Sequence, residues 1–353
     1  MAALQIEVLI SRPGTAQLLY SGAVPNRSGG SATDQLHVFT KKILITAGRS
    51  SVGASPLLAH NSTFHKQVIK GLCLYFIFNA VSGQIRTIRL TWLDRFYAVV
   101  NTQSIAKTDI AQLVRRSTDL SLLEQIDPIK ATLLLEETPT GHSVLYAATH
   151  LIKSLDVASP FERFEKLWRA FNALYKAFAG CTRDFDCHVA LAARIRANPG
   201  LFPLSIAKIS PLTEDNIRSS IRWNQMILNN YATTARANAL KDAILRVDDH
   251  RIIGIYSSSL PVREQHLRAA GHHAMVAAYI QNKIMANIRR DADVLVTLCI
   301  QYMYFVRNKI AHAERADHGF SFMHGSFDES EILWLTPFLE ALVVDLINIS
   351  DTF

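Results

Sequence analysis

The chain has 353 residues, of which 49% are hydrophobic and 19% are charged, and its formal net charge is +7. This composition provides enough apolar side chain for a sizeable core and excludes a wholly disordered chain. The length predicts two domains, or one large domain with insertions. Residues 1–140 carry 14 Lys and Arg against 9 Asp and Glu, whereas residues 141–353 carry 23 against 21. This modest basic excess fits a polyanionic partner such as RNA, but it also fits many other soluble proteins.

The sequence shows no sign of export or membrane insertion. Its N-terminus has no basic segment ahead of a long apolar run, and its most apolar window, residues 71–81, is too short to span a bilayer. The four cysteines form no CxxC pair and have no histidines at zinc-ligand spacing, which favours reduced thiols over a disulfide or a metal site. We therefore expect a cytoplasmic protein with no membrane attachment, no metal and no cofactor.

Residues 1–140 are predicted to form a mixed α/β region whose role the sequence does not indicate. Its first part contains two stretches rich in β-branched residues, 4–10 and 36–46, and each is interpreted as β structure. Gly and Ser are concentrated at residues 26–34, between these stretches, and predict a loop there.

The second part of this region contains two apolar runs and one helical pattern. The runs at 73–79 and 84–92 are rich in aromatic and β-branched residues and flank a Ser-Gly turn, so they are interpreted as a β-hairpin. A helix is expected over 108–126, because Thr108 can serve as its N-cap and Asp109 lies in its first turn.

The C-terminal part, residues 141–353, is predicted to be a helical domain. Its clearest helix covers 161–178, where aromatic and aliphatic residues recur at steps of three and four and form one wide apolar face. Pro160 stands just before this helix and Gly180 just after it, at the positions where these residues favour a helix start and a helix end. Further helices are expected over 142–155, 187–197, 213–245 and 261–289.

The most informative segment lies near the C-terminus. Residues 293–306 are apolar around nearly the whole helical circumference, which predicts a buried central helix. This helix runs directly into the sequence Arg-Asn-Lys-Ile-Ala-His at residues 307–312. A polar connection and a final amphipathic helix over 331–349 follow.

An arginine and a histidine can together cleave RNA without a metal. The histidine takes the proton of the 2′-hydroxyl or donates one to the leaving 5′-oxygen, because its pKa lies near physiological pH. The arginine holds the phosphate and stabilises the charge that develops on its oxygens. On an ideal helix, positions five residues apart differ by about 140°. The helix must therefore end or bend between the two residues, or a second copy of the chain must complete the site.

The Arg-x4-His spacing alone is a weak signal, because it occurs three times, at 183/188, 268/273 and 307/312. The first pair lies in a polar connection, and the second straddles Gly271 in a helix of surface character. Only the third pair lies at the C-terminal end of a buried helix. A charged group there is costly in free energy unless it has a structural or functional role. A structural alternative remains equally open, because cations at a helix C-terminus bind the last carbonyls, and His312 could be such a cap.

The sequence of residues 307–312, placed after a strongly apolar helix and before a final helix, resembles the signature of HEPN domains. That signature is Arg, a polar residue that is often Asn, three variable residues and His. The helix at 161–178 is similar to the opening helix of the Apea-like branch of the same superfamily. The resemblance covers residues of about 141–350, and residues 200–290 form an enlarged helical insertion that it does not match.

The resemblance implies a helical bundle that forms a homodimer, in which two Arg/His motifs meet in one metal-independent ribonuclease site. Arg307 would then clamp the phosphate, His312 would act as acid and base, and Asn308 would position the substrate. Lys309 and Arg315, beside these residues, are predicted to bind the substrate. Cleavage would leave a 2′,3′-cyclic phosphate.

Many HEPN proteins are toxins or effectors of antiphage defence, so RNA and an antitoxin or defence-system protein are the expected partners. The sequence departs from one group of these proteins. HEPN toxins controlled by nucleotidyltransferase antitoxins have Tyr two positions after the His, whereas this chain has Glu314. Control by an antitoxin of that kind is therefore not expected. The alternative function is a HEPN-fold module that binds RNA, nucleotide or protein without cutting. A helical scaffold in which Arg307 and His312 only cap the helix is a third.

Overall fold

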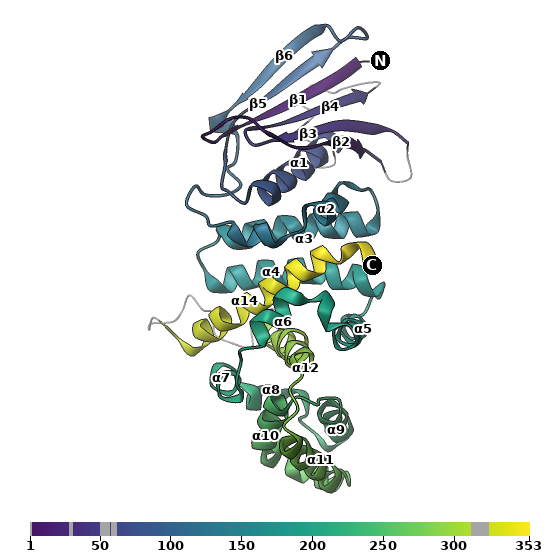
Figure 1. The fold of residues 1–353 in the computed structure, drawn as a ribbon, viewed down its shortest axis with the longest axis vertical. Helices are drawn as coiled ribbons and strands as arrows, with labels where there is room; N and C mark the ends of the chain where they lie inside the picture. Colours follow the sequence, from purple (N-terminus) through teal and green to yellow (C-terminus); the bar gives the residue numbers. More distant parts are fainter. Residues whose placement is uncertain (1, 28–30, 50–56, 58–61, 312–324) are drawn as a thin grey trace. The chain divides into compact units, whose positions relative to one another are not determined.

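The computed structural model describes residues 2–27, 31–49, 57, 62–311 and 325–353 (Figure 1). The chain is mostly helical, at 62%, and has a six-stranded antiparallel sheet in its N-terminal part. Its contacts divide it into two compact units, of which the first comprises Met1–Cys181 with Leu346–Phe353 and the second comprises Thr182–Asp345. The two units divide after Cys181, and the domain boundary expected at residue 140 falls within the first unit. That boundary stays a prediction.

The sheet of the first unit has the strand order β2-β3-β4-β1-β5-β6, with every neighbouring pair antiparallel. Alternate residues of the central strand β1, namely Leu4, Ile6 and Val8, are completely buried, and their neighbours on the other face are not. This is the period of two that a sheet with one covered face requires. The strands are β1 (Ala2–Ser11), β2 (Leu18–Pro25), β3 (Thr33–Phe39), β4 (Lys42–Arg49), β5 (Gln84–Leu93) and β6 (Val99–Ala106).

Helix α1 (Thr63–Asn79) covers the buried face of the sheet (Figure 1). A glycine, Gly71, lies where the helix approaches most closely. A Cβ atom at this position would be 2.8 Å from Cγ2 of Ile43 and 3.3 Å from Cδ1 of Leu36. Gly71 therefore allows the helix backbone to lie close to the side chains of β3 and β4.

The remaining helices of this unit confirm the strongest sequence prediction. Helix α4 (Pro160–Ala179) begins and ends as expected, with the Ser159 hydroxyl accepting from the Glu162 backbone N–H and Gly180 in the left-handed conformation at φ 59°. Helix α3 (Pro139–Asp156), expected over 142–155, packs on α4. The other short elements are α2 (Pro128–Ala131), η1 (Lys107–Asp109), η2 (Ser121–Gln125), η3 (Thr132–Leu135) and η8 (Ser350–Thr352).

Two predictions for the first unit are wrong. Residues 73–79 are not a strand but the last two turns of α1, so β5 pairs with β1 and β6 instead. The helix expected over 108–126 is replaced by irregular chain between η1 and η2. The chain is held there by Asp156, whose carboxylate accepts from the Arg115 backbone N–H at 2.7 Å and from the Thr118 hydroxyl at 2.6 Å. Tertiary hydrogen bonds thus override the local helical pattern.

Gly141, in the first turn of α3, provides a stability test. A Cβ atom at this position would be 2.6 Å from the Glu136 carbonyl oxygen and 2.8 Å from that of Leu133, and backbone atoms cannot move away as a flexible side chain can. We expect Gly141→Ala to lower the free energy of unfolding by about 1–3 kcal/mol, as overpacking does. Gly48→Ala is the control, because no described atom lies within 4 Å of a Cβ there. Urea denaturation that gives equal stabilities for the two variants would contradict this prediction.

The second unit is entirely helical in its described residues. The single helices expected over 213–245 and 261–289 are wrong, since Ile221 is extended between two short helices and Gly271 adopts φ 74° between two others. Among the described residues, every helix is too short or too polar to cross a membrane. The elements are α5 (Asp184–Ala197), η4 (Pro199–Leu201), α6 (Pro203–Ile209), α7 (Glu214–Ser220), α8 (Trp223–Asn230), η5 (Thr234–Arg236), α9 (Ala237–Leu245), α10 (His250–Ala269), α11 (His273–Ala286), α12 (Asp291–Leu295), η6 (Val296–Tyr302), α13 (Met303–Ala311) and α14 (Phe327–Asn348).

Candidate active site

The elements α12, η6 and α13 form one continuous helical segment in the core of the second unit. Val294, Leu298, Tyr302 and Val306 on this segment are all completely buried. The central buried helix predicted over 293–306 is thereby confirmed. Its apolar circumference excludes water from most of its length, and polar side chains become frequent only at its C-terminal end.

The middle of this segment, η6, is a π-helix. The Met303 backbone N–H donates to the Leu298 carbonyl oxygen, five residues back, where an α-helix would bond four residues back. One extra residue in a turn rotates everything that follows by about 100° relative to an unbroken α-helix. The direction in which Arg307 projects is therefore set by this π-turn, which has no signature in the sequence.

Arg307 and Asn308 lie on α13, which ends at Ala311. Both side chains are half-buried, and Nη1 of Arg307 donates to Oδ1 of Asn308 at 3.1 Å. Among the described side chains, no carboxylate forms an ion pair with Arg307. The structure thus brings these two predicted residues together and leaves most of the guanidinium donors able to bind another anion. The predicted residues His312 and Arg315 lie outside the described residues.

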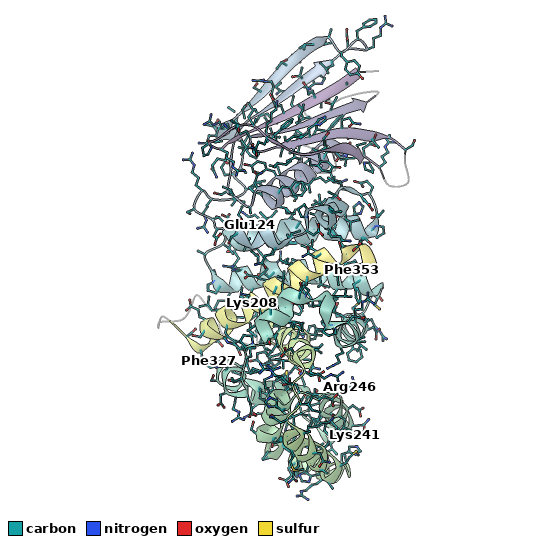
Figure 2. All side chains as sticks on the ribbon, in the orientation of Figure 1. Glu124, Lys208, Lys241, Arg246, Phe327 and Phe353 are labelled. Carbon is teal, nitrogen blue, oxygen red and sulfur yellow. The ribbon has the colours of Figure 1, made fainter. Side chains whose placement is uncertain are left out.

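Tyr302, five residues before Arg307, connects the segment to its neighbours. The Tyr302 hydroxyl accepts from the Arg222 backbone N–H at 2.6 Å and donates to the Glu331 carboxylate, which is buried. The Arg222 guanidinium forms an ion pair with Asp328 at 2.5 Å and lies over the ring of Phe327 at 4.5 Å. Phe327 is the first residue of α14 (Figure 2). These contacts join the end of η6, the N-cap of α8 and the first part of α14. These contacts could not be predicted from the sequence, because no local motif links residues so far apart in the chain.

Lys309 makes different contacts from those of Arg307. Its ammonium donates to Oδ1 of Asn229 at 2.7 Å and lies 5.7 Å from the centroid of the Phe305 ring. On an ideal helix, Lys309 projects about 200° away from Arg307, so the two cations do not share a face. That Lys309 binds the substrate remains a prediction, and in the structure its ammonium is engaged with α8.

The contacts also define the direction of α8 relative to the central segment. Tyr302 meets Arg222, and Lys309 meets Asn229, so an advance of seven residues along one helix matches seven along the other. These two contacts indicate that α8 runs in the same direction as the segment from Tyr302 to Lys309.

The other two Arg-x4-His pairs have structural contacts. Arg183 precedes α5 and forms an ion pair with Asp186, while His188 is buried in the same helix. Arg268 ends α10 and binds Glu264, and His273 begins α11 beyond the bend at Gly271. Unlike Arg183 and Arg268, Arg307 has no ion-paired carboxylate among the described side chains.

In the described part of the chain, no three His, Cys, Asp or Glu side chains gather as possible metal ligands. In comparisons with known proteins, no protein-family model, no curated protein and no solved structure matches this chain. The resemblance to HEPN domains is carried by residues 161–178 and 307–312.

Proposed function

We propose that the chain is a metal-independent endoribonuclease of the HEPN type that acts as a homodimer. The observation that supports this most is Arg307, a half-buried guanidinium near the end of a buried helix that has an amide partner and no ion-paired carboxylate among the described side chains. A structural capping arginine would be expected to bind the helix C-terminal carbonyls. Arg307 instead binds the side chain of Asn308 and keeps donors for a phosphate.

The proposed reaction is an internal transphosphorylation. The 2′-oxygen of a ribose attacks the adjacent phosphorus as the bond between phosphorus and the 5′-oxygen breaks. The His312 imidazole of one copy removes the 2′-hydroxyl proton, the protonated His312 of the other copy supplies a proton to the leaving 5′-oxygen, and Arg307 stabilises the charge on the non-bridging oxygens. The products are a 2′,3′-cyclic phosphate and a 5′-hydroxyl, and no water or metal takes part in the bond change.

The proposal that two copies form the site comes from the resemblance and is compatible with helix geometry. Positions five apart on an ideal helix diverge by about 140°, so one copy can supply the arginine while the other supplies the histidine. We propose that the enzyme serves as a toxin or an antiphage-defence effector, a role that the resemblance to HEPN proteins implies.

A cleavage assay with matched variants tests this function. The wild type, Arg307→Ala and His312→Ala are incubated with total RNA in EDTA, and the decoy variants Arg268→Ala and His273→Ala control for the loss of an arginine or a histidine at the same spacing. We expect cleavage by the wild type and both decoys, and none by the two motif variants. RNA binding without cleavage by the wild type would favour a binding module. Motif variants that cut normally, or that only lower the melting temperature by several degrees, would support a capping role.

A further inference from the structure

The sheet of the first unit has a face that α1 does not cover. The pairing of the strands places residues of this face in neighbouring rows that run across the sheet. Six residues of the face carry a charge or an aromatic ring: Glu7, His37, Phe39, Lys42, Arg86 and Arg89. In one row, Glu7 of β1 lies beside Leu44 of β4 and Arg89 of β5. In the next row, Leu9 lies beside Lys42 and Thr87. We call this surface the open face.

The charges on the open face are arranged around a single carboxylate. Glu7 accepts from Lys42 at 3.2 Å through Oε1 and from Arg89 at 3.1 Å through Oε2, so it holds two cations on either side of β1. Lys42 and Arg89 keep 35% and 48% of their side-chain surface exposed, which leaves their charged groups accessible to a ligand. Arg86, also exposed, donates to the Ser11 hydroxyl at 3.2 Å. Three cations face one anion, and the surface is complementary to a polyanion.

Two rings lie beside these cations on β3. The centroids of His37 and Phe39 are 6.5 Å apart, with their planes tilted by 37°, and both side chains are half-buried. The Lys42 ammonium lies 5.4 Å from the centroid of the Phe39 ring. A ring next to a phosphate-binding cation is the combination that holds an unstacked base and its backbone together.

We propose that the open face binds single-stranded RNA, with Lys42, Arg86 and Arg89 on the phosphates and the His37–Phe39 pair under the bases. The cations lie on β4 and β5, which are separated by two strand spacings, or about 10 Å. The bound RNA would therefore run across the β-strands of the sheet. Bases within a duplex could not reach the rings, which favours a single strand over double-stranded RNA. The choice of RNA over DNA rests on the proposed ribonuclease function. The binding of a single strand by these charges and rings is argued independently of that function.

Fluorescence anisotropy with a labelled 12-nucleotide oligouridylate tests this inference. All proteins are full-length and carry Arg307→Ala, so that cleavage cannot remove the probe. We expect Arg86→Glu/Arg89→Glu to weaken binding by at least about tenfold. It should also reduce the magnitude of the slope of log K against log salt by about 1.4, which corresponds to roughly 0.7 for each lost phosphate contact.

Three further variants make the result specific. Arg169→Glu/Arg183→Glu changes the net charge equally at two exposed arginines that are also ion-paired, one on α4 and one at the N-cap of α5, and we expect less than about a twofold effect from it. Glu7→Gln should tighten binding, because it frees both cations from their acidic partner. Phe39→Ala should weaken it by about fivefold or more, through lost stacking. Thermal unfolding confirms that each variant is folded.

Several outcomes would overturn the inference. These are no binding by the parent protein at low salt, equal loss of binding in the two double variants, weaker binding after Glu7→Gln, and tighter binding of a 12-base-pair RNA duplex. Failure of the ribonuclease proposal gives a different result, in which the oligouridylate binds as expected but the chain with Arg307 intact never cuts it.

Discussion

Replacing Arg307 with lysine should lower the rate of RNA cleavage by about 100-fold or more, although the positive charge is retained. A guanidinium presents two parallel N–H donors to the phosphate oxygens, whereas an ammonium is a single point charge. Arg307 also donates to Oδ1 of Asn308 at 3.1 Å, a contact that orients the plane of the guanidinium. Single-turnover cleavage of a labelled oligonucleotide measures the effect on the chemical step.

The matched control is the same exchange at an exposed arginine outside the motif, Arg268→Lys. Arg268 forms an ion pair with Glu264 on α10, so we expect this variant to change the rate by less than about threefold. Wild-type cleavage by Arg307→Lys would show that charge alone suffices and would contradict the bidentate phosphate clamp.

The largest expected effect on stability is at Glu137, which lies between α1 and the start of α3. Its carboxylate accepts from Lys70 at 2.7 Å and from Lys66 at 2.6 Å, and it contacts His142 at 3.0 Å. Lys70 is completely buried and also donates to the Leu135 carbonyl oxygen at 2.6 Å. One carboxylate thus neutralises a lysine that has no access to water.

Glu137→Gln should lower the free energy of unfolding by about 3–5 kcal/mol, because it removes the carboxylate that forms an ion pair with the buried Lys70 ammonium. The control is Glu165→Gln, which removes an ion pair whose two side chains are each 58% exposed and should change stability by less than about 1 kcal/mol. Urea denaturation measures both. Equal stability of the two variants would show that the buried cluster is not what holds α1 to α3.

The same carboxylate predicts how stability depends on pH. Burial alone would raise the pKa of Glu137, but hydrogen bonds from Lys66, Lys70 and His142 lower it from its usual 4.5 to about 2. Because the folded pKa is the lower one, the contribution is fully present above about pH 4.5 and is lost as the pH falls towards 2. The wild type should therefore lose more stability than Glu137→Gln between about pH 5 and about pH 3. Parallel loss in the two proteins would contradict the assignment.

The elements that the sequence predicted well are those with both a clear period and clear ends. Helix α4 has a wide apolar face, a proline at its first position and a glycine at its end, and the structure reproduces all three. The buried segment before Arg307 was predictable because nothing else accommodates an apolar helical circumference. The placement of Arg307 and Asn308 near the end of that segment followed directly.

The wrong or missing predictions of secondary structure also have physical causes. Residues 73–79 are aromatic and β-branched, which favours a strand, but they belong to a helix buried over much of its surface, where composition no longer separates the two structures. Strand β6 was not predicted because almost all of its residues are exposed, so it lacks the alternation that identifies a strand. Breaks such as the left-handed Gly271 divided helices that looked continuous.

The surroundings of the candidate site were the least predictable part. The π-turn of η6 has no sequence signature, and the Tyr302 contacts with Arg222 and Glu331 join residues 80 and 29 positions apart. The open face also depends on strand register, because Lys42 and Arg89 are brought to the same carboxylate only by the pairing of β4, β1 and β5. Such contacts are properties of the tertiary structure.

The most direct test of the proposed chemistry uses an RNA oligonucleotide in which the ribose at the mapped cleavage position is replaced by 2′-deoxyribose. In EDTA, the unmodified RNA should be cut to a fragment ending in a 2′,3′-cyclic phosphate, as determined by mass spectrometry, and the deoxy-substituted linkage should stay intact. Cleavage at the deoxy linkage, or fragments ending in a 3′-hydroxyl, would mean that the 2′-oxygen is not the nucleophile and that Arg307 and His312 do not act as proposed.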